Sequence, residues 1–277
     1  MASIGNIEFG LHRKANEEPY PTAVICALTR PFAEDVRWSL EDGSWIVVAK
    51  KGSRYICANG RALQEHDHAK NDGINALMQA LDLACMQSNI ALNLSKPGDN
   101  HIVLFKNNDQ AVARITSTFD LAASMDISIE VRNKDGEIVP QSMAPTPVWH
   151  RALRYYRLSQ LAGDIYEAYR NLYLAFEAIA EALYPRGKNE REGEWVRRCF
   201  KEIHGKYNLS PYAPNGHSAP SEYLFGTLYE HTRCSLFHAR TVDSILPFYE
   251  TDTSKMQNAY VTLLRIWRQL ASSEFHV

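Results

Sequence analysis

The chain has 277 residues, of which 45% are hydrophobic and 22% are charged, and its formal net charge is −2. This length suffices for two folded domains, and the composition excludes a disordered or low-complexity protein. The near-neutral charge excludes a strongly basic protein that coats nucleic acid over its whole surface. The sequence contains neither a run of about 18 apolar residues nor the apolar core of a signal peptide, so we expect a cytoplasmic protein without a membrane span.

Short segments rich in β-branched and aromatic residues predict strands in the first half of the chain. They are residues 22–28, 43–50, 53–57, 101–106, 111–118 and 126–132. Residues 74–93 place apolar side chains at helical spacing instead, so one helix interrupts the strands. The polar residues 65–72, with His66 and His68, predict a solvated loop. Residues 1–145 are therefore expected to form an α+β domain, whose role no catalytic or phosphate-binding motif defines.

Three prolines within residues 139–148 mark the boundary to a second domain, residues 146–277. Helical periodicity is strongest at 164–184, where Asp164 is the expected N-cap. The further expected helices are 149–161, 191–207, 221–239 and 255–271. The fold class that follows is α+β, with a mixed N-terminal domain and an all-α C-terminal bundle of four or five helices.

The two domains differ in charge. Residues 1–145 carry 14 Lys and Arg against 18 Asp and Glu, whereas residues 146–277 carry 16 against 14. The second domain has basic clusters at Arg151, Arg154 and Arg157 and across residues 186–206, which suit a ligand with phosphate groups. The five cysteines include no CxxC pair, so we expect reduced, mostly buried thiols.

The segment YEHTRCSLFHAR, residues 229–240, contains an Arg-x4-His motif from Arg233 to His238. With the long helix that begins about 70 residues earlier, the segment resembles the HEPN family of small helical bundles, whose signature is Arg, four to six residues, then His near the end of a helix. The resemblance covers residues 150–272. It implies a homodimer through the helical domain that binds RNA or cleaves it without a metal ion, of the kind found in bacterial toxin–antitoxin and phage-defence systems.

The geometry of the motif limits how its two residues can act together. On a straight α-helix a separation of five residues places Arg233 and His238 roughly 140° apart. They converge only if the helix ends or unwinds, or if two protomers meet at a two-fold axis. In such a site His238 would exchange a proton with the ribose or the leaving oxygen, and Arg233 would hold the phosphate.

Three neighbouring positions bear on whether the motif cleaves RNA. Cys234 follows the arginine where active family members commonly have Asn, Asp or His, so a silent module that binds a nucleotide or a partner protein is the alternative hypothesis. The candidate supporting residues of the site are Glu177 and Asn171 on the long helix, together with Cys234 and Glu230 near Arg233. A purely structural interpretation pairs Arg233 with Glu230 on its own helix and leaves Glu177 exposed or paired with Arg170.

Two further patterns carry alternatives. His231, Cys234 and His238 share one helical stripe and would form a metal site with His204 or His217, as in a metal-dependent hydrolase, although such a set also suits a core. Otherwise no cofactor is expected. Tyrosines alternate with arginines in the first two helices of the bundle and serve either base stacking or packing. They are Tyr155, Tyr156, Tyr166, Tyr169 and Tyr173.

Overall fold

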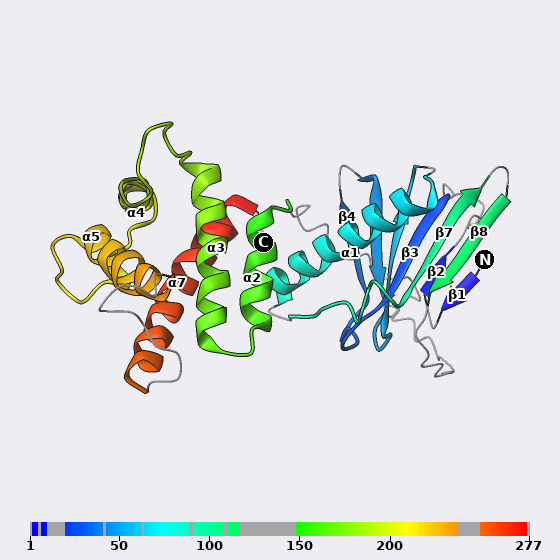
Figure 1. Ribbon diagram of the computed structural model, residues 1–277, viewed down its shortest axis with the longest axis horizontal. Coiled ribbons are helices and arrows are strands. Elements are labelled where there is room, and N and C mark those ends of the chain that lie inside the picture. Colours follow the sequence, from blue (N-terminus) through cyan, green and yellow to red (C-terminus); the bar gives the residue numbers. More distant parts are fainter. Residues whose placement is uncertain are drawn as a thin grey trace, which may run out of the picture. The chain divides into compact units, whose positions relative to one another are not determined.

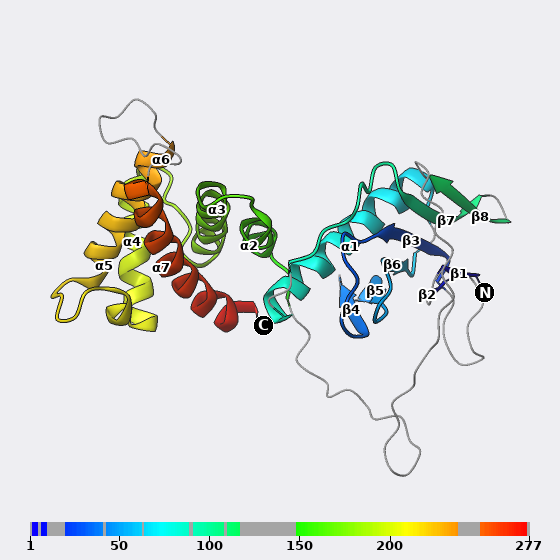
Figure 2. The ribbon, with the colours of Figure 1, turned by 90° about the horizontal axis from the view of Figure 1, so that it is seen from below.

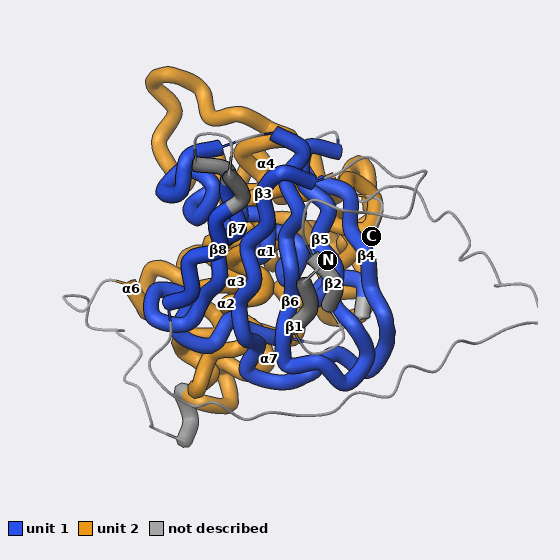
Figure 3. The backbone as a smooth tube through the Cα atoms, turned by 90° about the vertical axis from the view of Figure 1, so that its right-hand side faces the viewer, with its two compact units in different colours: residues 1–146 blue, residues 147–277 orange. Residues whose placement is uncertain are grey.

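A computed structural model of the chain describes residues 2–4, 7–9, 20–40, 43–62, 64–88, 91–107, 110–116, 148–237 and 250–275. The chain forms two compact units, Met1–Thr146 and Pro147–Val277 (Figure 3). The first contains an antiparallel sheet and one long helix, and the second contains helices (Figure 1). The predicted α+β class is confirmed at this level.

The first unit is built on a six-stranded antiparallel sheet with the strand order β4-β5-β6-β3-β7-β8. Its strands are β3 (Thr22–Ala27), β4 (Val36–Leu40), β5 (Trp45–Ala49), β6 (Tyr55–Gly60), β7 (His101–Asn107) and β8 (Gln110–Thr116). Strands β1 (Ala2–Ile4) and β2 (Ile7–Phe9) form a separate pair. Helix α1 (His66–Ser88) packs along one face of the large sheet (Figure 2).

Most strands coincide with the predicted segments, but the start of α1 does not. The helix begins at His66, so the loop predicted for residues 65–72 is wrong. The imidazole of His66 packs edge-on against the ring of Phe105 at 5.1 Å, and Ala69 is buried, while the polar residues between them face outward. Strands β1, β2 and β4 were not predicted, and residues 126–132 lie outside the described residues.

Gly73 allows α1 to approach the sheet closely. A Cβ atom at this position would lie 2.7 Å from the Cβ of Val24, a fully buried residue of β3. We expect Gly73→Ala to lower the free energy of unfolding by about 1–3 kcal/mol, because the overpacking exceeds the gain in helix propensity. Gly205→Ala in the second unit meets no atom within 4 Å and is expected to stabilise. Urea unfolding of both variants measures this difference in sign, and equal effects would contradict it.

The second unit consists of helices that pack around α3 (Ile165–Leu183). The others are α2 (Arg151–Leu161), α4 (Glu192–Tyr207), the short 3-10 helix η2 (Ser210–Tyr212), α5 (Pro220–Leu224), the π-helix η3 (Phe225–Cys234), α6 (Ser235–Phe237) and α7 (Glu250–Phe275). Asp164 caps α3 as predicted, since its Oδ1 accepts the backbone N–H of Glu167 at 2.8 Å. The α-helix predicted over residues 221–239 is wrong in its middle part, which is a π-helix.

Aromatic side chains fill the core of the helical unit. Tyr156 stacks on Trp267 with ring centroids 4.3 Å apart, and Phe176 stacks on Phe200 at 5.2 Å. Four of the five predicted stacking tyrosines are buried in this way, which favours packing over base binding for them. Only Tyr155 keeps an intermediate exposure.

The cysteines and the helices bear on two further expectations from the sequence. Four of the five free cysteines are buried, as predicted, and Cys234 is half-buried. None of the helices in the described part of the chain combines the length and the apolar character that crossing a bilayer requires.

Candidate functional site

Arg233 lies near the end of η3, in which backbone N–H groups bond to carbonyls five residues earlier. Two hydroxyl groups bond to carbonyl oxygens inside this helix. The Thr232 hydroxyl donates to the carbonyl oxygen of Thr227, and the Tyr169 hydroxyl donates to that of Leu228, both at 2.7 Å. Because Tyr169 reaches η3 from α3, the bond is a tertiary contact that local sequence patterns do not encode.

The π-helix changes the geometric argument about the motif. In a π-helix each residue turns the chain by less than in an α-helix, so a separation of five residues comes closer to one full turn. Only Arg233 and Cys234 of the motif lie inside η3, however, and Ser235–Phe237 form the α-helix α6, so the π-helix alters the 140° separation only at the start of the motif. His238 itself lies outside the described residues, which end here at Phe237.

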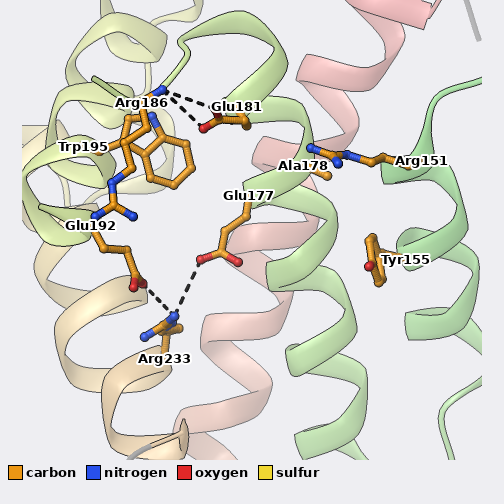
Figure 4. Close-up of a pocket in the computed structure, with 9 residues that line it drawn as sticks. All are labelled: Arg151, Tyr155, Glu177, Ala178, Glu181, Arg186, Glu192, Trp195 and Arg233. Carbon is orange, nitrogen blue, oxygen red and sulfur yellow. Dashed lines mark hydrogen bonds and ion pairs between the residues drawn. The ribbon is translucent and has the colours of Figure 1, made fainter. Parts of the chain in front are cut away.

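Two carboxylates from other helices hold the guanidinium group of Arg233 (Figure 4). Its Nη2 lies 2.6 Å from Oε1 of Glu192 at the start of α4 and 3.8 Å from Oε1 of Glu177 on α3. The Arg233 side chain is only 15% exposed. Burial lowers its pKa, but Glu192 and Glu177 outweigh burial and raise the pKa above the ordinary value. Arg233 therefore stays charged and is fixed in direction.

Aromatic rings enclose the same guanidinium group. Its central carbon lies 5.1 Å from the ring centroid of Phe237, 5.5 Å from that of Tyr229 and 5.9 Å from that of Tyr173. Such rings attract a cation and exclude water from it, which strengthens its ion pairs. The surroundings therefore hold Arg233 in one orientation from several sides.

Glu177 carries the less engaged of the two carboxylates. Its side chain is 23% exposed, and Arg233 at 3.8 Å is its nearest ion-pair partner, beyond hydrogen-bonding distance. Burial raises the pKa of Glu177, the charge of Arg233 lowers it, and the charge of Glu192 raises it, with a net increase above the ordinary value of 4.5. The structural alternative, in which Glu177 pairs with Arg170, is wrong, because Arg170 pairs with Glu167 at 3.8 Å.

Of the other predicted supporting residues, Glu230 and Asn171 have partners outside this cluster, and Cys234 lies beside one of its rings. Glu230 pairs with Arg197, with 3.7 Å between Oε1 and Nη2, so the expected pair of Glu230 with Arg233 is wrong. The side-chain amide of Asn171 donates to Glu167 at 3.1 Å. Cys234 is half-buried and lies beside Tyr229. Burial and neighbouring acidic groups raise the pKa of Tyr229. Among the predicted site residues, the structure thus brings together Arg233 and Glu177.

The metal-site alternative receives no support from the described residues. Within them, no three His, Cys, Asp or Glu side chains are grouped as a metal ion would require. The Nδ1 atom of His204 accepts the N–H of Leu209 at 3.0 Å, and that of His217 accepts the N–H of Ala219 at 3.2 Å. Both histidines offered as a fourth ligand therefore serve local backbone bonds.

Arg233 and Glu177 line an open pocket of about 390 Å³ within the helical unit (Figure 4). Helices α2, α3, α4 and η3 and the loop after α3 all contribute to its wall. Three arginines and three glutamates supply its charge, namely Arg151, Arg186, Arg233, Glu177, Glu181 and Glu192. Tyr155, Ala178 and Trp195 complete the lining. The volume lies in the range of small-molecule sites, and the mostly charged lining suits a polar ligand rather than an apolar one.

The loop between α3 and α4 is fixed by hydrogen bonds. The backbone N–H of Arg186 donates to both carboxylate oxygens of Glu181, at 3.3 and 3.4 Å, and its Nε donates to the carbonyl oxygen of Glu190 at 2.7 Å. Arg198 binds the Glu190 carboxylate with two bonds of 2.8 Å and holds the pKa of that carboxyl at about 2. The loop thus places the Arg186 side chain at the pocket without the aid of a ligand.

The sequence pointed to this pocket only in part. Arg151 and Arg186 belong to the basic clusters of the second domain, but Glu181, Glu192 and Trp195 carried no functional signal. Comparison of the chain with models of known protein families, with curated proteins and with solved structures gave no match. The resemblance to the HEPN family therefore stays a prediction, based on the Arg-x4-His motif.

Proposed function

We propose that the helical unit is HEPN-like, binds RNA at the pocket beside Arg233 and cleaves it without a metal ion. The observation that carries this proposal is the placement of Arg233 in the pocket wall, where Glu192 and Glu177 orient it before any ligand arrives. A charged donor that needs no reorganisation is what stabilises the growing charge on a phosphoryl group. RNA cleavage without a metal ion requires a donor of this kind beside the phosphoryl group.

The proposed reaction is an attack of the ribose 2′-hydroxyl on the adjacent phosphorus atom. The hydroxyl proton is removed, the bond from phosphorus to the 5′-oxygen breaks, and that oxygen receives a proton, which leaves a 2′,3′-cyclic phosphate and a 5′-hydroxyl. His238 exchanges these protons, since a histidine titrates near neutral pH. In the sequence it follows Phe237, whose ring lies 5.1 Å from the Arg233 guanidinium group. Arg233 stabilises the negative charge on the phosphoryl oxygens.

We further propose that two copies of the chain associate through their helical units, so that the motifs of both protomers serve one groove. The sequence resemblance supports this assembly and a role as an RNA-cleaving component of a bacterial toxin–antitoxin or phage-defence system. Analytical ultracentrifugation of the full chain measures the assembly independently of RNA cleavage.

The second candidate function is a silent module that binds a nucleotide or a partner protein. It is favoured by Cys234 and by the two carboxylates that already neutralise Arg233. Under this function the pocket binds its ligand and no bond is broken. The α+β unit would then contribute recognition.

Incubation of the full chain with single-stranded RNA in EDTA tests both candidates. We expect cleavage, and we expect His238→Ala to slow it by roughly 10²–10⁴-fold through loss of proton transfer. His231→Ala is the matched control, because His231 is an exposed histidine on η3 and is expected to leave the rate unchanged. Equal rates for the wild type and His238→Ala would end the catalytic assignment. RNA binding without any cleavage would establish the silent module instead.

A further inference from the structure

The helices α2 and α3 contribute three polar groups to the pocket that take part in no hydrogen bond in the described part of the chain, although Glu177 has an ion pair with Arg233 at 3.8 Å. Among the described residues, no hydrogen bond reaches the Glu177 carboxylate, the Arg151 guanidinium group or the Tyr155 ring hydroxyl. Arg151 and Tyr155 are four residues apart on α2 and therefore share one face of that helix. All three side chains line the pocket, and Figure 4 shows the Glu177 side chain extending from α3 toward Arg233, with Arg151 and Tyr155 on the side of α2.

The Glu177 carboxylate, which accepts no hydrogen bond from the described residues, is the most informative of the three groups. A carboxylate that is partly removed from water and receives no hydrogen bond from the protein is unfavourable, and burial raises the pKa of Glu177 accordingly. Of the other pocket carboxylates, Glu181 accepts a backbone N–H, and Glu192 forms a close ion pair with Arg233 at 2.6 Å. Glu177 is thus the carboxylate left for a ligand, and its two oxygens suit a pair of adjacent donors.

The four RNA bases differ in how their Watson–Crick edges meet a carboxylate. Guanine presents two adjacent donors, N1–H and the N2 amino group, which match the two oxygens. Adenine and cytosine place a ring acceptor beside their amino group, and uracil flanks its single donor with two carbonyl oxygens. A carboxylate is repelled by those acceptors. Guanine is therefore the base that this acceptor selects.

We propose that the pocket binds a guanine nucleotide unit of the RNA, with Glu177 accepting the two donors of the base, Tyr155 stacking on its ring and Arg151 contacting its phosphate. This inference rests on the proposed function, in which RNA is the ligand. The pocket volume of about 390 Å³ falls in the range of sites for small-molecule ligands. The charge balance of the pocket also suits a ligand that carries donors as well as an anionic group.

Binding of mononucleotides to the full chain in EDTA, measured by titration calorimetry, tests the proposal. We expect GMP to bind roughly 10–100-fold more tightly than AMP, CMP or UMP, with IMP between them because it lacks the N2 amino group. In Glu177→Gln one oxygen is replaced by a donor, so the preference for GMP should fall to about twofold or less. Glu167→Gln, an exposed residue of α3 outside the pocket, is the matched control and should keep the preference.

A second variant tests the proposal in case Glu177→Gln does not fold properly. Tyr155→Ala removes the stacking ring and should weaken GMP and AMP alike, by roughly 5–100-fold, while the ratio between them stays. Equal affinities of the wild type for all four nucleotides, or an undiminished preference in Glu177→Gln, would overturn the guanine proposal. If RNA is cleaved in EDTA without preference for guanine, the proposed function stands and this inference fails. If neither RNA nor any nucleotide binds, both fail.

Discussion

Arg233→Ala is expected to slow RNA cleavage by about 10³-fold or more, because it removes the charged donor that Glu192 and Glu177 hold in place in the pocket wall. Glu192 and Glu177 then remain without their cation, so the variant also repels a phosphate. Arg233→Lys keeps the charge but loses the planar fork, and we expect it to recover little of the rate. Single-turnover cleavage of a labelled oligonucleotide in EDTA measures all three proteins.

Arg197→Ala serves as the control for this experiment. Arg197 is half-exposed, pairs with Glu222 and Glu230 and lies outside the pocket, so its removal changes the net charge equally. We expect its cleavage rate to stay within about twofold of the wild type, since exposed ion pairs contribute little. A comparable loss in Arg197→Ala would show that bulk charge, rather than the placed guanidinium group, determines RNA cleavage.

The fold was predictable wherever a local pattern coincides with a complete element. The α3 stripe and its cap at Asp164 predicted that helix to within about a residue, because both signals are local. The start of α1 was missed because its first turns are polar and are held by a distant strand through His66 and Phe105. The short strand β4 was missed for a related reason, since it is defined by pairing with β5.

The candidate site was predictable only for residues that a motif or a helical position singled out. Arg233 and Glu177 were found in this way, but the acid expected beside Arg233, Glu230, lies on the wrong face once the helix is a π-helix. Glu192 lies at the start of a helix, where acidic residues are common for reasons unrelated to a site. Its contact with Arg233 depends on how η3 packs against α4, which no single segment encodes.

The same cluster predicts how stability depends on pH. Glu177 has a pKa above its ordinary value of 4.5 in the folded protein, so the folded state binds its proton more tightly than the unfolded state does. The stability from this proton is present at low pH and is lost as the pH rises through the folded pKa. Above that pH, Arg233 limits the cost of the ionised carboxylate, because its charge is the largest influence that lowers the pKa of Glu177.

Arg233→Ala is therefore expected to lower the free energy of unfolding by about 2–3 kcal/mol at pH 8, because it leaves partly buried carboxylates without a cation. The loss should shrink as the pH falls toward the raised pKa of Glu177, since protonation of Glu177 removes the repulsion. Urea unfolding of the variant and the wild type at several pH values measures the difference.

In the double variant Arg233→Ala/Glu177→Gln most of the loss at pH 8 should be recovered. A loss of stability in Arg233→Ala that depends neither on pH nor on Glu177 would contradict the argument. Glu177→Gln alone should leave the free energy of unfolding unchanged or raise it. This result is expected if the carboxylate serves a ligand rather than the stability of the fold.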